Sequence, residues 1–278
     1  MCQLLGMNCA TPTDITFSFS GFAARGGETD QHSDGWGIAF FEDKACRLFI
    51  DHESAATSAL AQLVKNYPIK SRNVIAHIRK ATFGVTMLEN CHPFMRELWG
   101  RHWIFAHNGH LTGYTPELNR IYQPVGSTDS EQAFCDMLEQ LRAHFGNKSP
   151  SLDDIFEALA RFVMPIHEHG TFNFLLSNGQ ALFAYATTRL QYVVREYPFK
   201  KAHLVDTDMD IDFSQHTKPG DRVAVIATEP LTDDESWIPF ECGELIWFQD
   251  GKPHRRMLTL SPEQQVAAKA RAVTLADR

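Results

Sequence analysis

Short runs of apolar residues that end in polar ones recur through the first half of the chain and predict β-strands. They cover residues 2–6, 34–41, 47–51, 73–79 and 103–107. Apolar residues at helical spacing instead predict helices over 54–67 and 130–145. Ser151-Leu-Asp-Asp154 is a capping box, and it predicts a further helix that runs towards Met164, just before Pro165. Two consecutive helices therefore follow the first group of strands.

The second half of the chain returns to strand-like patterns. Asn178-Gly179 lies between apolar runs at 172–176 and 180–187, and this dipeptide is a strong signal for a β-hairpin. Further strands are predicted over 192–196, 221–228 and 244–248, with a turn at Asp250-Gly251 and a last helix near Ser261. Many strands with two central helices, and without regular βαβ alternation, favour an α+β fold of stacked antiparallel sheets.

Composition narrows the class of protein. The 278 residues carry 26 basic and 34 acidic side chains, a net charge of −8 that argues against a nucleic-acid-binding protein. The start of the chain has no basic segment followed by an apolar one, and no apolar stretch reaches membrane-spanning length. The six cysteines lie far apart without a CxxC pair, so we expect thiols rather than disulfides or a zinc knuckle. These features predict a soluble cytoplasmic protein that does not bind membranes.

Cys2 is the first candidate for chemistry. If Met1 is removed, Cys2 carries a thiol and a free α-amino group on one residue. The amino group has an ordinary pKa of about 7.7–8.0 and the thiol one of about 8.5, so the amine is a suitable base for the thiol. A lone cysteine at this position is also compatible with an ordinary buried strand residue.

Three other motifs complete a possible ligand site. Arg79 ends a predicted strand, and its planar guanidinium can pair with a carboxylate. Asn108-Gly109 follows another strand and offers a side-chain amide beside a backbone N–H, as an oxyanion hole requires. Asp129 precedes a helix, where it is either an ordinary N-cap or a carboxylate for an ammonium group. Together they would hold an α-amino acid whose side-chain carbonyl is attacked, and glutamine fits this description.

Six motifs in order resemble the class II glutamine amidotransferases, which are N-terminal-nucleophile hydrolases. The motifs occupy roughly the first half of the chain and read Met1-Cys2, Asp34-Gly-Trp-Gly-Ile-Ala39, His77-Ile-Arg79-Lys-Ala-Thr82, Asn90-Cys-His92-Pro-Phe94, Phe105-Ala-His107-Asn108-Gly109 and Ser127-Thr-Asp129-Ser-Glu131. The second motif is similar to the stand-alone branch, in which no synthase domain follows. The resemblance implies a four-layer αββα fold, formed by one glutamine amidotransferase domain over residues 1–278.

The resemblance also implies roles for individual residues. Cys2 would attack the glutamine amide and form a γ-glutamyl thioester, while Asn108 and Gly109 would stabilise the oxyanion. Arg79 would bind the substrate carboxylate, Asp129 its ammonium group, and Thr82 would support the loop around Arg79. His77 would be structural. No cofactor or metal is expected, and the pair His167 and His169 lacks a third ligand.

The chain departs from the family pattern at two places. His32-Ser33 occupies a position where some branches carry Arg, so we consider Arg25 as a substitute, and Phe83 stands where some relatives have His.

Three functions remain open. The first is hydrolysis of glutamine to glutamate and ammonia, with the ammonia released or passed to a separate enzyme. In the second, the same centre hydrolyses another γ-glutamyl compound, whose leaving group would be recognised by the second half of the chain. The third is a non-catalytic glutamine-binding protein, if Met1 is retained.

Overall fold

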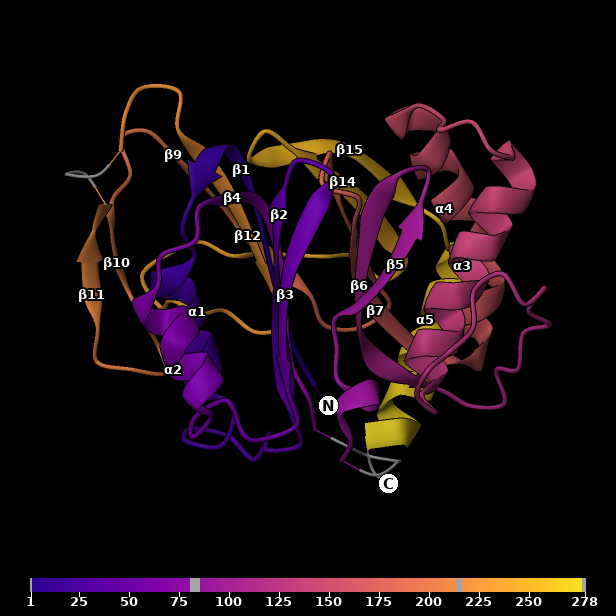
Figure 1. Ribbon diagram of the computed structural model, residues 1–278, viewed down its shortest axis with the longest axis horizontal. Coiled ribbons are helices and arrows are strands. Elements are labelled where there is room, and N and C mark those ends of the chain that lie inside the picture. Colours follow the sequence, from indigo (N-terminus) through magenta and orange to yellow (C-terminus); the bar gives the residue numbers. More distant parts are fainter. Residues whose placement is uncertain (1, 81–85, 214–216, 277–278) are drawn as a thin grey trace.

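Two antiparallel sheets lie face to face in the computed structural model, which describes residues 2–80, 86–213 and 217–276 (Figure 1). The first sheet contains, in spatial order, β13 (Ile238–Pro239), β9 (Gln191–Glu196), β12 (Arg222–Ala227), β1 (Gln3–Thr13), β4 (Ser71–Ile78), β2 (Trp36–Glu42) and β3 (Ala45–Asp51). The second contains β15 (Lys252–Leu258), β14 (Glu244–Gln249), β8 (Leu182–Ala186), β7 (Gly170–Ser177), β6 (Arg101–Leu111) and β5 (Phe94–Leu98). The first strand of the chain is therefore central in its sheet.

Helices cover the outer face of each sheet (Figure 1). The first sheet is covered by α1 (Thr16–Ala24) and α2 (Ala59–Asn66), next to the small β10 (Lys201–His203) and β11 (Asp210–Asp212) pair. The second is covered by α3 (Asp129–Phe145), α4 (Leu152–Ile166) and α5 (Pro262–Ala276). Short 3₁₀ turns include η1 (Leu88–Asn90) and η2 (His167–His169). The expected four-layer αββα arrangement, two antiparallel sheets flanked by helices, is confirmed.

Alternation along β6 shows how the layers are filled. Ile104 and Ala106 point into the core between the sheets, whereas Trp103 and Phe105 pack with α3 and α4 on the outer face. A strand sends successive side chains to opposite faces. Asn108 therefore falls on the inter-sheet side and His107 on the helix side.

The predicted elements are recovered with several differences. The helix expected over 54–67 begins only at Ala59, because Ser58 accepts the hydrogen bond from the Ala61 N–H and caps it. The helix predicted from Ser151 continues through Pro165 to Ile166. The pattern did not predict α1, β5 or β15.

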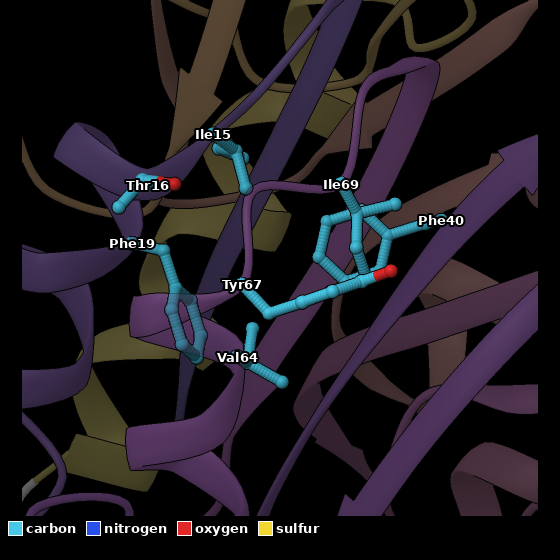
Figure 2. Close-up of a pocket in the computed structure, with 7 residues that line it drawn as sticks. All are labelled: Ile15, Thr16, Phe19, Phe40, Val64, Tyr67 and Ile69. Atoms are coloured by element: carbon cyan, nitrogen blue, oxygen red, sulfur yellow. The ribbon is translucent and has the colours of Figure 1, made fainter.

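The outer layer over the first sheet encloses a small apolar pocket between α1, α2 and β2 (Figure 2). Its lining side chains are Ile15, Thr16, Phe19, Phe40, Val64, Tyr67 and Ile69. The pocket leaves no room for a water molecule, so it is a gap in the packing and no ligand site.

Candidate active site

Cys2 lies immediately before β1, at one end of the central strand. Gln3 pairs with Ile78, which places Cys2 beside the residues that follow β4. The Lys80 N–H donates a hydrogen bond to Cys2 Sγ over 3.3 Å, and the thiol contacts the Lys80 carbonyl oxygen at 3.5 Å. Burial raises the pKa of the Cys2 thiol above its ordinary value, while the Lys80 hydrogen bond and the Arg79 charge oppose this shift. The thiol is therefore protonated at neutral pH and needs a base before it can act as a nucleophile.

Arg79 is buried next to Cys2, and its backbone is held by the turn before β2. The Arg79 N–H donates to the Gly35 carbonyl oxygen at 2.8 Å, and the Asp34 N–H donates to the Arg79 carbonyl oxygen at 3.2 Å. The guanidinium Nη1 also donates to the Asp34 carbonyl oxygen at 3.4 Å. The Asp-Gly-Trp-Gly motif thus fixes the position of Arg79. Thr82, predicted to support this loop, lies outside the described residues.

Asn108 reaches the same end of the sandwich from the second sheet. Its Nδ2 donates to Thr228 Oγ1 at 3.4 Å, and Thr228 Oγ1 also accepts from the Leu4 N–H at 2.9 Å. One hydroxyl therefore connects the predicted oxyanion donor with the strand that carries Cys2. Among the described residues, Asn108 Oδ1 has no hydrogen-bond partner, although the side chain is buried.

Packing between β6 and β7 requires a glycine at position 109, in addition to the chemical role predicted for it. A Cβ atom at this position would lie 1.9 Å from the Thr171 carbonyl oxygen and 2.5 Å from His107 Nε2. Both distances are far inside van der Waals contact, so any other residue would push β6 away from β7.

Asp129 is the first residue of α3, but it is not the N-cap, since Thr128 fills that position. Its Oδ2 accepts from the Leu111 N–H at 2.6 Å and lies 3.3 Å from His110 Nδ1. Its Oδ1 accepts from the Ser130 N–H at 2.7 Å. The carboxylate is thus fixed at the end of β6, two residues after Gly109. His110, which the sequence reasoning did not single out for this site, is its ionic neighbour.

His107 connects the start of α3 with β6 and β7. Its Nε2 lies 3.1 Å from the Thr171 carbonyl oxygen, which can only accept, so this nitrogen carries the proton. Nδ1, 2.8 Å from Ser130 Oγ, then accepts from the hydroxyl. Burial lowers the pKa of His107, which favours this neutral form.

Two more buried histidines lie beside the site. The rings of His77 and His92 are 4.1 Å apart between centroids, in an edge-to-face arrangement. Burial lowers the pKa of His77 to about 3 and that of His92 well below its usual range. Both rings are therefore neutral at physiological pH and pack against each other.

Arg25 does not stand free as a substitute for the missing family arginine. It is buried, and its Nε donates to Asp206 Oδ2 at 2.7 Å. Its Nη1 donates to the Glu229 carbonyl oxygen at 3.1 Å and contacts Gln3 Oε1 at 3.5 Å. Arg25 therefore ties Gln3, the residue after Cys2, to the segment that follows β12.

The structure brings Cys2, Arg79, Asn108, Gly109 and Asp129 to one end of the two sheets. The charges of Arg79 and Asp129 both act on the Cys2 thiol, with opposite effects on its pKa. Thr228, whose hydroxyl connects Asn108 with β1, was not found from the sequence, because residues far apart in the chain meet only in the folded sheets. Within residues 2–80, 86–213 and 217–276, no group of three His, Cys, Asp or Glu side chains is arranged to hold a metal ion. No helix in the same ranges is both long and apolar enough to span a membrane.

Comparison with known proteins gives a consistent result. A model of the class II glutamine amidotransferases matches residues 1–272. A Haemophilus influenzae protein named "Putative glutamine amidotransferase" is 54% identical over 252 residues, covering 91% of this chain and 85% of that protein. An Escherichia coli protein, "Putative glutamine amidotransferase YafJ", is 49% identical over 88% of this chain and 96% of its own length.

Two solved structures have folds similar to the two-sheet architecture of this chain. The crystal structure of a predicted glutamine amidotransferase from Pseudomonas aeruginosa has a TM-score of 0.74 and 41% identity, and the match covers 91% of this chain and 100% of that one. A class II domain protein from Silicibacter pomeroyi, at 18% identity over 92% of this chain and 98% of that one, has a TM-score of 0.56 and supports the fold alone.

Proposed function

Because the chain belongs to the class II glutamine amidotransferases, we propose that it hydrolyses the side-chain amide of glutamine through a Cys2 thioester. The observation that carries this proposal is the position of the Cys2 thiol, hydrogen-bonded to Lys80 beside Arg79 and at the same sheet end as Asn108. Substrate carboxylate, scissile carbonyl and nucleophile would then occupy one small region.

The first step needs a base, because burial raises the pKa of the thiol. In our proposal Met1 is removed, and the freed α-amino group of Cys2 accepts the thiol proton. Sulfur attacks the amide carbon, and the tetrahedral oxyanion is stabilised by Asn108 Nδ2 and the Gly109 N–H. The C–N bond breaks, the proton passes to the leaving nitrogen, and ammonia departs. Water then cleaves the C–S bond and yields glutamate.

The substrate head group would be bound by opposite charges. Arg79 would pair with the α-carboxylate, and Asp129 with the α-ammonium group next to His110. Thr82 is proposed to support the Arg79 loop. The ammonia is released or passed to a separate enzyme.

The test is the intact mass of the protein purified from its native cells, before and after exposure to a diazo-ketone analogue of glutamine. We expect loss of the Met1 mass and one adduct, mapped to Cys2. Cys2→Ala should remove both the adduct and glutamine turnover and remain folded. Cys46→Ala is the matched control, since burial raises the pKa of that thiol to about 12 and it should not react.

Retained Met1 without an adduct would instead support a non-catalytic glutamine-binding protein. Glutamine turnover in Cys2→Ala would refute the nucleophile assignment.

A further inference from the structure

An open pocket of about 470 Å³ adjoins the site and takes no part in the reaction described above. It is lined by Thr188, Arg189, Leu190, Gln191, Glu229, Pro239 and Phe240. Its volume falls in the usual range of small-molecule sites, about 300–1,000 Å³. Ammonia is close in size to a water molecule, which takes up about 30 Å³ in the liquid. The release of ammonia alone therefore does not account for a pocket of this size.

One wall of the pocket is fixed to the strand of the nucleophile. Thr228 continues the β1–β12 pairing, since its N–H donates to the Leu4 carbonyl oxygen at 3.1 Å. The next residue, Glu229, therefore falls opposite Gln3. Arg25 confirms this placement, because its Nη1 contacts both Gln3 Oε1 and the Glu229 carbonyl oxygen. The pocket wall at Glu229 thus lies opposite Gln3, the residue next to Cys2.

The other wall is fixed to the predicted oxyanion donor. Asn173 Nδ2 donates to Thr188 Oγ1 at 2.7 Å and to the Asn108 carbonyl oxygen at 2.9 Å. Its Oδ1 accepts from the Thr188 N–H at 2.9 Å. The buried side-chain amide of Asn173 therefore sets the position of the pocket segment, residues 188–191, relative to Asn108.

The order of the strands places the pocket on the side of Cys2 away from the head-group residues. Arg79 follows β4, on one flank of β1, while β12 and β9 lie on the other flank. In the second sheet, β6 leads to Asp129, whereas the pocket residues 188–190 follow β8, and β7 separates β8 from β6. A substrate whose glutamyl head contacts Arg79 and Asp129 would direct its leaving group towards Glu229 and Arg189.

The chemistry of the lining points to a charged leaving group. Arg189 Nη1 donates to Glu229 Oε1 at 3.2 Å, and both side chains are substantially exposed. A guanidinium has five N–H donors, so this contact uses only part of its capacity to bind a carboxylate. Phe240 adds an apolar surface.

We propose that this pocket binds the amine part of a γ-glutamyl amide, and that this amine is an amino acid or short peptide whose carboxylate pairs with Arg189. The inference rests on the proposed function, because it uses the same thioester chemistry. The C–N bond of the γ-glutamyl amide breaks as the C–S bond forms, the leaving amine takes the thiol proton, and water later releases glutamate.

The test compares three substrates: glutamine, γ-glutamylglycine and γ-glutamylethylamide. The last two differ chiefly in the carboxylate. We expect kcat/KM for γ-glutamylglycine to exceed that for the ethylamide by about tenfold or more, as for loss of a hydrogen bond to a charged group. The value of kcat/KM depends on the steps up to release of the amine. Hydrolysis of the thioester, which is the same for both amides, therefore does not mask the difference between them.

The decisive variant is Arg189→Gln, which should bring the ratio between the two amides close to one. Arg47→Gln is the matched control, because Arg47 forms a similar exposed ion pair with Glu42 at 2.7 Å, on β2 and β3. Its ratio should equal that of the unmodified protein.

Two outcomes would overturn the inference in different ways. If glutamine is hydrolysed but the amide ratio is near one, or is unchanged by Arg189→Gln, the pocket assignment fails and the proposed function stands. If no substrate is hydrolysed and the diazo-ketone forms no Cys2 adduct, both fail together.

Discussion

The buried pair His77 and His92 should make the protein sensitive to mild acid. Burial lowers the pKa of His77 to about 3, whereas an unfolded histidine titrates near 6.5. Between these values the unfolded chain binds a proton that the folded protein does not bind. The free energy of unfolding therefore falls as pH decreases below about 6.5.

The size of the change in the free energy of unfolding follows from the pKa values of His77 in the folded and unfolded states. At pH 5 the unfolded state gains about 2 kcal/mol from protonation of one such histidine, relative to pH 7.5. His92 is shifted in the same direction, so the pair should contribute about twice this amount. Carboxylates titrate mainly below this window, and the histidine contribution is therefore separable from theirs.

The assay is urea unfolding at pH 7.5 and pH 5.0 for the unmodified protein and for His77→Gln. The substitution itself changes the stability of the protein. The quantity to compare is therefore, for each protein, the free energy of unfolding at pH 7.5 minus that at pH 5.0. We expect this difference to be about 2 kcal/mol smaller in His77→Gln. His52→Gln, at an exposed position beside Asp51, is the control and should match the unmodified protein. An equal pH dependence in His77→Gln and the unmodified protein would refute the assignment of His77 as a neutral buried group.

Two further predictions concern the site itself. Arg79→Lys keeps the positive charge but loses the planar guanidinium that can bind a carboxylate through two hydrogen bonds. KM for glutamine should therefore rise about tenfold, with a smaller change in kcat. Steady-state kinetics in which kcat fell and KM did not change would contradict the carboxylate contact. Gly109→Ala places Cβ 1.9 Å from the Thr171 carbonyl oxygen and should lower the free energy of unfolding by about 1–3 kcal/mol or more, with loss of turnover. Gly6→Ala, whose Cβ would meet the side-chain tips of Leu175 at 3.0 Å and Leu182 at 3.2 Å but no backbone atom so close, should cost less in the same denaturation experiment.

The sequence predicted most of the sheets but not the helix α1, and the reason is physical. Seven of its nine residues are buried, including Phe17, Phe19 and Phe22, so it has no polar face to produce a helical period. Its N-cap, Ile15, provides no side-chain hydrogen bond either. The start of α2 was misplaced for a related reason, because Ser54 and Ser58 are equally good caps in sequence and only Ser58 caps the helix.

The candidate site was found largely from local motifs, but its connections were not. Cys2 precedes β1, Arg79 follows β4 and Asn108 lies near the end of β6, and each of these strands has a recognisable pattern. Thr228, by contrast, is 120 residues from Asn108 in the chain, and its contact depends on how β12 pairs with β1. Such a contact follows from sheet register, which short-range patterns do not specify.

The division of the site between two sheets has a consequence for how this protein can change. Cys2 belongs to the first sheet and Asn108 to the second, so the apolar layer between them works as a spacer for the reacting groups. Leu4, Ile104 and Ala106 lie in that layer. A change of side-chain volume there would alter the gap between nucleophile and oxyanion donor, although none of these residues touches the substrate in our proposal. Apart from the start of α3, which carries Asp129, the solvent-facing surfaces of the outer helices do not have this effect and can diverge while the reaction geometry is kept.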